Sequence, residues 1–345
     1  MINARVENLL TEQMITKAMR HIEQKKGGPG SDGILWYELS DYWKKHGNAI
    51  KKDICNGCYK PLPGKKILLR KPGKKERRVL EIPCMIDRMI LYAIHSVLAP
   101  YYNPLFSNNS YGFRRGRGCS EALDACMKKI NSGFEYVIDL DIKCFFDEVD
   151  HSVLLRTLQQ NIQDPRFLKL IEGYIKLKVW YGNHTYIKHI GISQGSALSP
   201  LLANVYMDAL DRYIEKSGVP FVRYADDVVI FCASYDEAKR LLNKVKVYLK
   251  EALHLRLNSE KTQIVSPEEL VYLGYGFKKK VNQYEFVISD KRKQKIKRNM
   301  EVLISKKGQN LHEKLDRIGM FNRGWLNYYK KVNSEDLKAL VLVYK

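Results

Sequence analysis

Hydrophobic positions recur every three to four residues over several long stretches of the chain, which predicts amphipathic helices. The first such stretch, 3–26, ends at the segment Gly27–Gly33, whose Gly, Pro, Ser and Asp residues signal a loop. Further helices are predicted over 37–56, 84–102, 120–131, 150–160, 165–178, 199–217 and 235–252, with two or three more in the basic C-terminal segment.

Short runs rich in β-branched and aromatic residues lie between these helices and predict strands. Residues 66–69 and 78–82 form a predicted hairpin, and 221–232 splits into two apolar runs around Ala225–Asp227. Further strands are predicted over 136–142, 184–190, 262–265, 271–277 and 284–288. Helices mixed with short strands and hairpins argue for an α+β fold rather than a doubly wound sheet.

Composition adds limits to this picture. The 345 residues are 45% hydrophobic and 11% aromatic, so we expect two or three subdomains with sizeable cores. There is no run of about 18 apolar residues and no apolar signal region at the N-terminus, so no membrane span is expected and a cytoplasmic location is predicted. The seven Cys are scattered, which fits reduced thiols.

The charge is strongly positive and uneven. Lys and Arg exceed Asp and Glu by 59 to 38, for a net charge of +21, which indicates a polyanionic partner, above all nucleic acid. Segment 278–345 holds 18 Lys and Arg against 7 Asp and Glu, and segment 60–78 holds nine basic residues and one Glu. Two basic segments on either side of an acidic centre are expected of a charged channel around a metal site.

The acidic centre consists of carboxylates inside apolar β-type runs. Asp226 and Asp227 lie at the tip of the predicted 221–232 hairpin, where adjacent carboxylates repel unless a cation compensates them. Asp141 lies in the apolar run 136–142, where a charge is otherwise costly. Such a set suits two metals about 3.5–4 Å apart for phosphoryl transfer. Asp139 faces the same side as Asp141, so physical reasoning leaves both open.

These residues also carry a family resemblance. Tyr224–Asp227 (Tyr-Ala-Asp-Asp) resembles the signature of reverse transcriptases, and Asp141–Asp147 is similar to the first palm motif of bacterial group II intron-type enzymes. The resemblance selects Asp141 over Asp139. It implies that the three aspartates, with the backbone carbonyl of Ile142, bind two Mg²⁺, for which Mn²⁺ can substitute, and that Phe146 is the steric gate against a 2′-OH.

Further motifs in the same order extend the resemblance over nearly the whole chain. Gly27–Gly33 resembles the N-terminal extension loop of these enzymes, and Gly324–Tyr329 resembles their thumb. By resemblance, the remaining site residues are Lys71, Arg78, Gln194, Gly195 and Lys261 for the dNTP, Leu273 and Gly274 for the primer grip, and Arg114, Arg115 and Arg117 for the template RNA.

The resemblance implies a right-hand polymerase with an N-terminal extension (1–34), fingers (35–135), a palm (136–277) and a basic helical thumb (278–345). The expected activity is RNA-directed DNA polymerisation, with an RNA template, a DNA or RNA primer and dNTPs, and a dedicated structured RNA as a further partner. Alternative roles are the same polymerase serving antiphage defence or CRISPR spacer acquisition, and a maturase-like RNA-binding chaperone. RNA-templated RNA synthesis is disfavoured by the bulk of Phe146.

Overall fold

The computed structural model describes residues 4–70, 77–281, 283–305, 310–333 and 337. The helices in these ranges are α1 (Val6–Leu9), α2 (Glu12–Lys25), the 3-10 turn η1 (Trp36–Glu38), α3 (Leu39–Cys55), α4 (Met85–Leu105), α5 (Cys119–Asn131), α6 (Phe145–Glu148), α7 (His151–Gln159), α8 (Pro165–Ile175), α9 (Ser199–Lys216), α10 (Tyr235–Leu253), α11 (Asp290–Ser305) and α12 (Leu311–Tyr328). The strands are β1 (Gly64–Arg70), β2 (Arg77–Ile82), β3 (Tyr136–Asp141), β4 (Lys178–Tyr181), β5 (His184–Ile187), β6 (Phe221–Tyr224), β7 (Asp227–Cys232), β8 (Gln263–Val265), β9 (Val271–Tyr272), β10 (Tyr275–Lys279) and β11 (Tyr284–Ile288).

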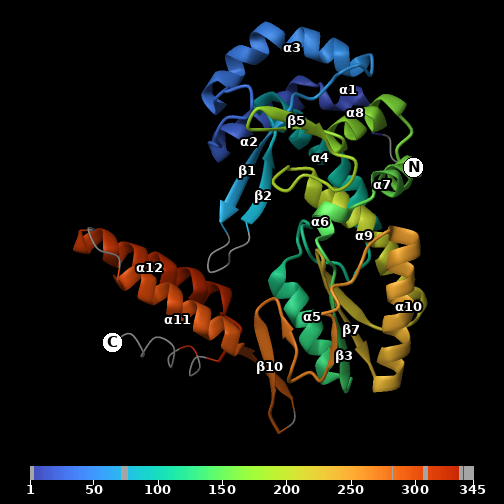
Figure 1. Cartoon of the computed structure of the whole chain (residues 1–345), viewed down its shortest axis with the longest axis vertical. Helices are drawn as coiled ribbons and strands as arrows, with labels where there is room; N and C mark the ends of the chain where they lie inside the picture. The colour runs from blue at the N-terminus through green and yellow to red at the C-terminus, as the bar shows by residue number, and fades with distance from the viewer. Residues whose placement is uncertain (1–3, 71–76, 282, 306–309, 334–336, 338–345) are drawn as a thin grey trace.

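The strands form three sheets, with the upper sheet above the central sheet and the third sheet beside the central one (Figure 1). The upper sheet has the order β2-β1-β4-β5, and its β1–β4 pairing is parallel. The central sheet has the order β6-β7-β3-β8 and is antiparallel throughout. The third sheet, β11-β10-β9, lies at the lower end and leads into α11 and α12, which lie side by side and extend away from the body (Figure 1).

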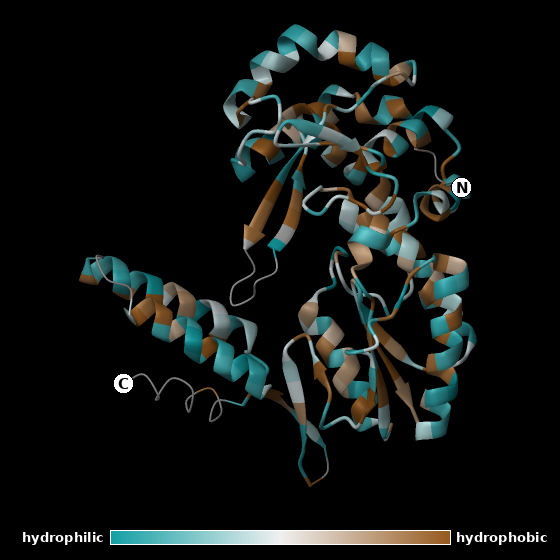
Figure 2. Ribbon diagram, viewed as in Figure 1, coloured by the Kyte–Doolittle hydropathy of each residue, from teal (hydrophilic) through white to brown (hydrophobic). Residues whose placement is uncertain are grey.

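Two hydrophobic cores support these layers. The larger core joins the N-terminal helices, α4 and α7–α10 to one side of the central sheet, through residues such as Ile138 and Ile230. The smaller core joins α5, the third sheet and the C-terminal helices to the other side, through Val137 and Val229. Adjacent strand residues therefore serve different cores, as the period of two requires. Hydrophobic positions gather on β3 and β7, whereas α3 is largely hydrophilic (Figure 2).

Most predicted elements are found within a few residues of their expected bounds, and the α+β class is confirmed. The predicted helix 3–26 is two helices, because the Thr11 side chain accepts a hydrogen bond from the Met14 amide at 3.3 Å and starts α2 anew. The predicted helix 165–178 ends at Ile175, because the following residues form β4, which pairs with β1. The predicted strand 271–277 is interrupted at Leu273–Gly274, where both residues have positive φ.

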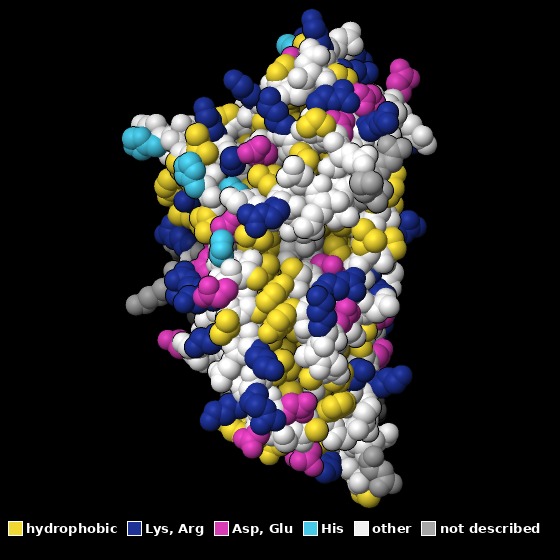
Figure 3. Space-filling model, turned by 90° about the vertical axis from the view of Figure 1, so that its right-hand side faces the viewer, with side chains coloured by type: hydrophobic (Ala, Val, Ile, Leu, Met, Phe, Trp, Pro, Cys, Tyr) yellow, Lys and Arg dark blue, Asp and Glu magenta, His cyan; other side chains and the backbone are white. Residues whose placement is uncertain are grey.

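The surface carries the excess of basic residues that the sequence contains. On the face seen in Figure 3, Lys and Arg side chains are spread over the whole length of the molecule, with acidic side chains among them. Within the described ranges, no helix combines the length and apolar character that crossing a membrane requires.

Candidate catalytic site

The central sheet brings together carboxylates that are far apart in sequence. β3 and β7 pair antiparallel, and the register places Asp141 directly opposite Asp227. Asp139 is opposite Val229 in the same register, two residues further from the turn. Asp141 therefore ends its strand beside the Asp226–Asp227 turn, whereas Asp139 lies further along the sheet.

The turn between β6 and β7 is tight and strained. Tyr224 pairs with Asp227, so Ala225 and Asp226 alone form the connection. Ala225 has φ 59°, the left-handed region that a primed two-residue hairpin turn requires and that a residue with a Cβ disfavours. A conformation of this kind persists only where its surroundings hold it.

A buried guanidinium holds this turn from behind. Arg223 is fully buried, and it donates two hydrogen bonds to the Asp211 carboxylate, at 2.7 Å from Nε and 2.6 Å from Nη2. Its Nη1 donates to the Ala225 carbonyl oxygen and to Asn204 Oδ1, each at 2.9 Å. A bidentate Arg–carboxylate pair has a fixed geometry, so helix α9, which carries Asp211 and Asn204, determines where the turn stands.

The loop before α5 packs against the same turn. A Cβ on Gly112 would lie 2.4 Å from the Ala225 amide nitrogen, so only glycine fits there. The Gly112 carbonyl accepts a hydrogen bond at 2.9 Å from Asn204 Nδ2, and the Tyr111 amide donates to the Arg223 carbonyl at 2.8 Å. The buried network of Arg223, Asp211, Asn204, Gly112 and Ala225 is hereafter called the turn-support network.

The third carboxylate is held by the segment after α10. The Asn258 amide donates to the Asp141 carbonyl at 2.8 Å, and the Asp141 amide lies 3.2 Å from the Thr262 hydroxyl. Lys261 comes from the same segment, and its ammonium nitrogen is 3.0 Å from Asp141 Oδ2. Both side chains are partly exposed, so the ion pair is open to exchange with other cations.

The electrostatics of the site show crowded negative charge. Desolvation by surrounding protein, followed by the nearby carboxylates of Asp226, Asp139 and Asp141, raises the pKa of Asp227 to about 6, although its side chain reaches solvent. Burial raises the pKa of Asp139 to about 6, against a weak hydrogen bond from Gln263. A bound cation would relieve this repulsion.

The donor set suits divalent metals, with one adjustment. In the ranges that the structure describes, no three acidic, His or Cys side chains converge into a formed metal cluster. However, Asp141 and Asp227 are cross-strand partners, and such partners have Cβ atoms about 5 Å apart. Carboxylate oxygens are the ligands that Mg²⁺ prefers, and gathering them around an ion would require side-chain rotation and release of Lys261 from Asp141.

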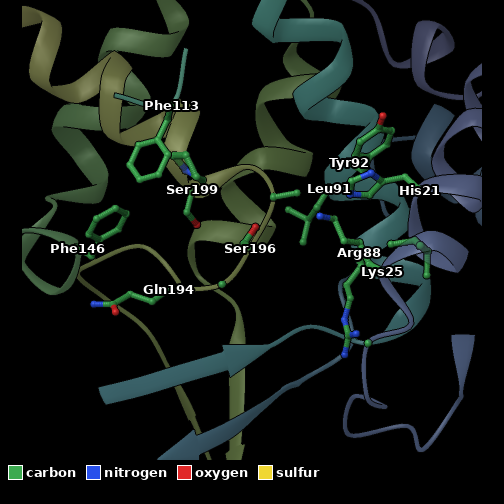
Figure 4. A pocket seen from close by; sticks show the side chains of 15 residues that line it. His21, Lys25, Arg88, Leu91, Tyr92, Phe113, Phe146, Gln194, Ser196 and Ser199 are labelled. Carbon is green, nitrogen blue, oxygen red and sulfur yellow. The ribbon is translucent and has the colours of Figure 1, made fainter. Parts of the chain in front are cut away.

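A pocket of about 450 Å³ adjoins this site. It brings Phe146, Gln194 and Gly195 together, three of the residues predicted to contact the dNTP, and adds Phe113, whose ring centroid is 6.5 Å from that of Tyr224. Phe113, Phe146 and Gln194 lie on one side of the pocket and face His21, Lys25, Arg88 and Tyr92 across it (Figure 4).

The predicted primer grip is anchored by the C-terminal helix. Leu273 and Gly274 have φ 49° and 83°, and their carbonyls accept hydrogen bonds from the hydroxyls of Tyr328, at 2.7 Å, and Tyr329, at 3.4 Å. Trp325 is buried in the smaller core. The aromatic residues of α12 thus hold a backbone segment of the site.

The basic residues predicted for substrate contact differ in their surroundings. Lys71 and the side chain of Arg78 lie outside the described residues. Arg114 is buried and donates to the carbonyls of Asn103, Ser107 and Ser110, so its position suits holding the loop rather than touching a template strand.

The other two predicted template contacts are nearer the surface. Arg115 is exposed. Arg117 is half-buried and donates to the Asn108 carbonyl at 2.6 Å.

Sequence reasoning overlooked the turn-support network. Its one signal was a charged residue, Arg223, inside the apolar run before the Asp-Asp pair. The structure adds an indication of its own that strain is concentrated at the site. Of the six non-Gly residues with positive φ in the described ranges, four lie within or directly beside the predicted site residues, namely Phe113, Cys144, Ala225 and Leu273.

Comparison with known families decides the assignment. Residues 69–277, more than half of the chain, match the family model described as reverse transcriptase (RNA-dependent DNA polymerase). The chain belongs to the reverse transcriptase family. The matched range includes all three aspartates, the Gln194 loop and the predicted primer grip.

Individual relatives confirm the group II intron type. The group II intron-encoded protein LtrA of Lactococcus lactis is 30% identical over 243 residues, which cover 69% of this chain and 40% of LtrA. Protein YkfC of Escherichia coli is 26% identical over 327 residues, which cover 81% of this chain and 84% of YkfC. The chain spans less than half the length of the first intron-encoded relatives.

Among solved structures, a chain of a partial Cas6-RT-Cas1–Cas2 complex matches with a TM-score of 0.46 and 23% identity, over 71% of this chain and 42% of that chain. A similarity at this level does not bear on function.

Proposed function

We propose that this chain is an RNA-directed DNA polymerase of the group II intron type, which extends a primer 3′-OH with dNTPs on an RNA template. The observation that carries the proposal is the register of β3 and β7, which sets Asp141 opposite Asp227 at the Asp226 turn. A binding protein for a polyanion gains nothing from three carboxylates at its centre, whereas phosphoryl transfer needs them to hold metal ions.

We also propose a right-hand division of the chain, which the separation of the sheets supports. We assign the upper sheet with α3 and α4 to the fingers, the central sheet with α9 and α10 to the palm, and α11 and α12 to the thumb. The N-terminal extension ends near residue 34. Residues 178–187 fall inside the palm range 136–277 but belong with the fingers in this assignment, because β4 pairs with β1.

In this proposal, Asp141, Asp226 and Asp227, with the Ile142 carbonyl, hold two Mg²⁺ ions, for which Mn²⁺ can substitute. When bound, the ions stabilise the attacking and leaving oxygens of the displacement.

The protein's own side chains position the substrates. Phe146 limits space at the sugar, and Gln194 with Gly195 contacts the new base pair. Lys71, Arg78 and Lys261 neutralise phosphate charge, and the primer strand lies against Leu273–Gly274. Arg115 is the exposed candidate for template contact, and Arg117 lies beside it.

The test is primer extension on poly(rA)/oligo(dT) with dTTP and Mg²⁺. Losing a metal site removes several kcal/mol of transition-state stabilisation, so we expect Asp226→Asn with Asp227→Asn to lower the rate about 10³-fold or more. Asp236→Asn, an exposed aspartate at the start of α10, is the matched control and should keep full activity.

Each other outcome has a definite meaning. Equal extension on poly(dA)/oligo(dT) contradicts the assignment of RNA as the template. No extension by the wild type, with salt-sensitive RNA binding retained, favours the maturase-like chaperone or a requirement for a dedicated structured RNA. Full activity in the double aspartate variant contradicts the metal site itself.

A further inference from the structure

The β4–β5 hairpin exposes an unusual number of large hydrophobic side chains. Five lie within eleven residues, with exposed fractions of 39% for Trp180, 48% for Tyr181, 41% for Tyr186, 46% for Ile187 and 51% for Ile190. All four residues of β5 are exposed, and β5 is the outer strand of the upper sheet. The register puts Tyr181 and Tyr186 on one face of the hairpin and Trp180 and Ile187 on the other. Exposed apolar side chains grouped on one element mark an interaction surface.

Two tyrosines and a lysine form one unit on this hairpin. The register pairs Val179 with Tyr186 and Tyr181 with His184, so Tyr181 and Tyr186 lie diagonally on one face of the sheet. The Lys66 ammonium, from β1, lies 5.0 Å from the Tyr181 ring centroid and 5.3 Å from that of Tyr186. We call Lys66, Tyr181 and Tyr186 the tyrosine platform.

The charge around the tyrosine platform suits a polyanion. No acidic residue occurs between Glu172 and Asp208, a segment that also holds three Lys and two His. The nearby Glu81 is buried and neutralised by Lys188, with 2.9 Å between their charged atoms. The surface therefore combines basic side chains with aromatic rings, the combination that binds single-stranded nucleic acid by stacking.

The tyrosine platform is separate from the catalytic pocket. Lys66 pairs with Glu81 in the β1–β2 hairpin, so Lys66 and Leu80 belong to opposite faces of the sheet. The face that carries Leu80 is the one that meets the loop of Gln194 and Gly195, since a Cβ on Gly195 would lie 4.0 Å from Leu80 Cδ2. The 450 Å³ pocket is lined from α2, α4 and the loops near Phe113, Phe146 and Gln194, not from β4 or β5.

We propose that the tyrosine platform binds a single-stranded RNA segment outside the polymerase cleft, with bases stacked on Tyr181 and Tyr186 and a phosphate near Lys66. Stacking is tolerant of sequence, so this surface would retain RNA without selecting a motif. The choice of RNA over DNA rests on the proposed function. The assignment of a stacking site rests only on the exposed tyrosines and Lys66.

The test measures binding with the cleft already occupied. The full chain is saturated with an unlabelled, chain-terminated DNA primer on an RNA template that has a two-nucleotide overhang, and a labelled 20-nucleotide single-stranded RNA is titrated in. Because base–aromatic stacking is worth about a factor of ten per base, we expect Tyr181→Ala with Tyr186→Ala to weaken binding at least about 10-fold. Extension of a short primer–template should stay within about two-fold of wild type.

Two further variants sharpen the result. Tyr37→Ala with Tyr235→Ala removes two tyrosines that are 60% and 50% exposed elsewhere, and should leave RNA affinity unchanged. Lys66→Gln should reduce the slope of log affinity against log salt by about 0.7, the value for one phosphate contact on a single strand.

Several outcomes would overturn the proposal. Unchanged RNA affinity in the platform variant removes it, and an equal loss in the Tyr37 and Tyr235 variant shows that the effect is not local. A matching loss of primer extension places the tyrosines in the polymerase cleft. A change from dimer to monomer in size-exclusion chromatography, with RNA affinity kept, assigns the face to a second copy of the chain. Tighter binding of single-stranded DNA than of RNA contradicts RNA as the occupant.

Discussion

The turn-support network makes a quantitative prediction about stability and catalysis. Arg223→Met leaves the Asp211 carboxylate buried without its partner and removes the donor to the Ala225 carbonyl. Breaking a buried ion pair from one side costs about 3–5 kcal/mol. We therefore expect the single variant to lose that much free energy of unfolding, and to lose activity through unfolding as well as through the site.

A double variant separates the two effects. Arg223→Met with Asp211→Leu removes the uncompensated charge, and replacing a buried pair by apolar residues of similar volume is often neutral or stabilising. Stability should recover in part, to within about 1–3 kcal/mol of wild type, because the buried Ala225 carbonyl and Asn204 Oδ1 lose their donor. The Ala225 carbonyl still lacks its donor, so the turn that carries Asp226 is free to shift, and a displacement of about 1 Å costs about 100-fold in rate.

The assays are denaturant unfolding and steady-state primer extension. In the double variant we expect kcat about 100-fold below wild type, with the KM for dTTP changed less than about three-fold, since the pocket residues are untouched. Arg212→Met is the control. Arg212 follows Asp211 in α9 but pairs with Asp208 and Glu215 at the surface, where such pairs are worth about 1 kcal/mol or less. Recovery of both stability and kcat in the double variant would refute a positioning role for Arg223.

Three other side-chain changes test the nucleotide pocket, the loop that packs on the Ala225 turn, and a buried carboxyl group in α4. Phe146→Ala should raise ribonucleotide incorporation at least about 10-fold in extension assays with rNTPs, and an unchanged ratio of rNTP to dNTP use would contradict the gate. Gly112→Ala should abolish extension, because its Cβ would lie 2.4 Å from the Ala225 amide, whereas Gly324→Ala, which meets no atom within 4 Å, should be neutral in activity. Burial raises the pKa of Asp87 to about 7, above its unfolded value, so the folded state binds more protons and the free energy of unfolding should fall as pH rises from about 4 to 7. Asp87→Asn should make this fall smaller in urea unfolding at pH 5 and pH 8, with the raised pKa values of Asp139 and Asp227 contributing what remains. An equal fall in Asp87→Asn and wild type would show that the pKa of Asp87 is not raised.

Local signals in the sequence were sufficient to predict most helices and to place Asp141, Asp226 and Asp227 at the ends of predicted strands. Thr11 marks the case where they were misread, because one continuous apolar period masked a capping residue that starts a second helix. β4 was missed because its apolar residues continue the pattern of α8, and they become a strand only through pairing with β5 and with β1, which lies more than a hundred residues earlier.

The burial of two arginines could not be predicted from the neighbouring sequence. Arg114 was predicted to contact the template, and Arg223 precedes the Tyr-Ala-Asp-Asp motif, yet both are buried, because carbonyls satisfy the donors of Arg114 and the Asp211 carboxylate pairs with Arg223. The Ser110 and Ala225 carbonyls are close in sequence, but Asn103 and Asp211 lie eleven and twelve residues away and meet the arginines only in the folded chain.

The sequence by itself determined the α+β class, the order of the motifs and the presence of Asp141, Asp226 and Asp227 in β-type runs. Only the tertiary structure decided that Asp141 rather than Asp139 is opposite Asp227, and that a buried arginine supports the β6–β7 turn that carries Asp226. The physical reason is that periodicity and turn residues act within one element, whereas strand register and burial depend on residues that meet only when the chain has folded.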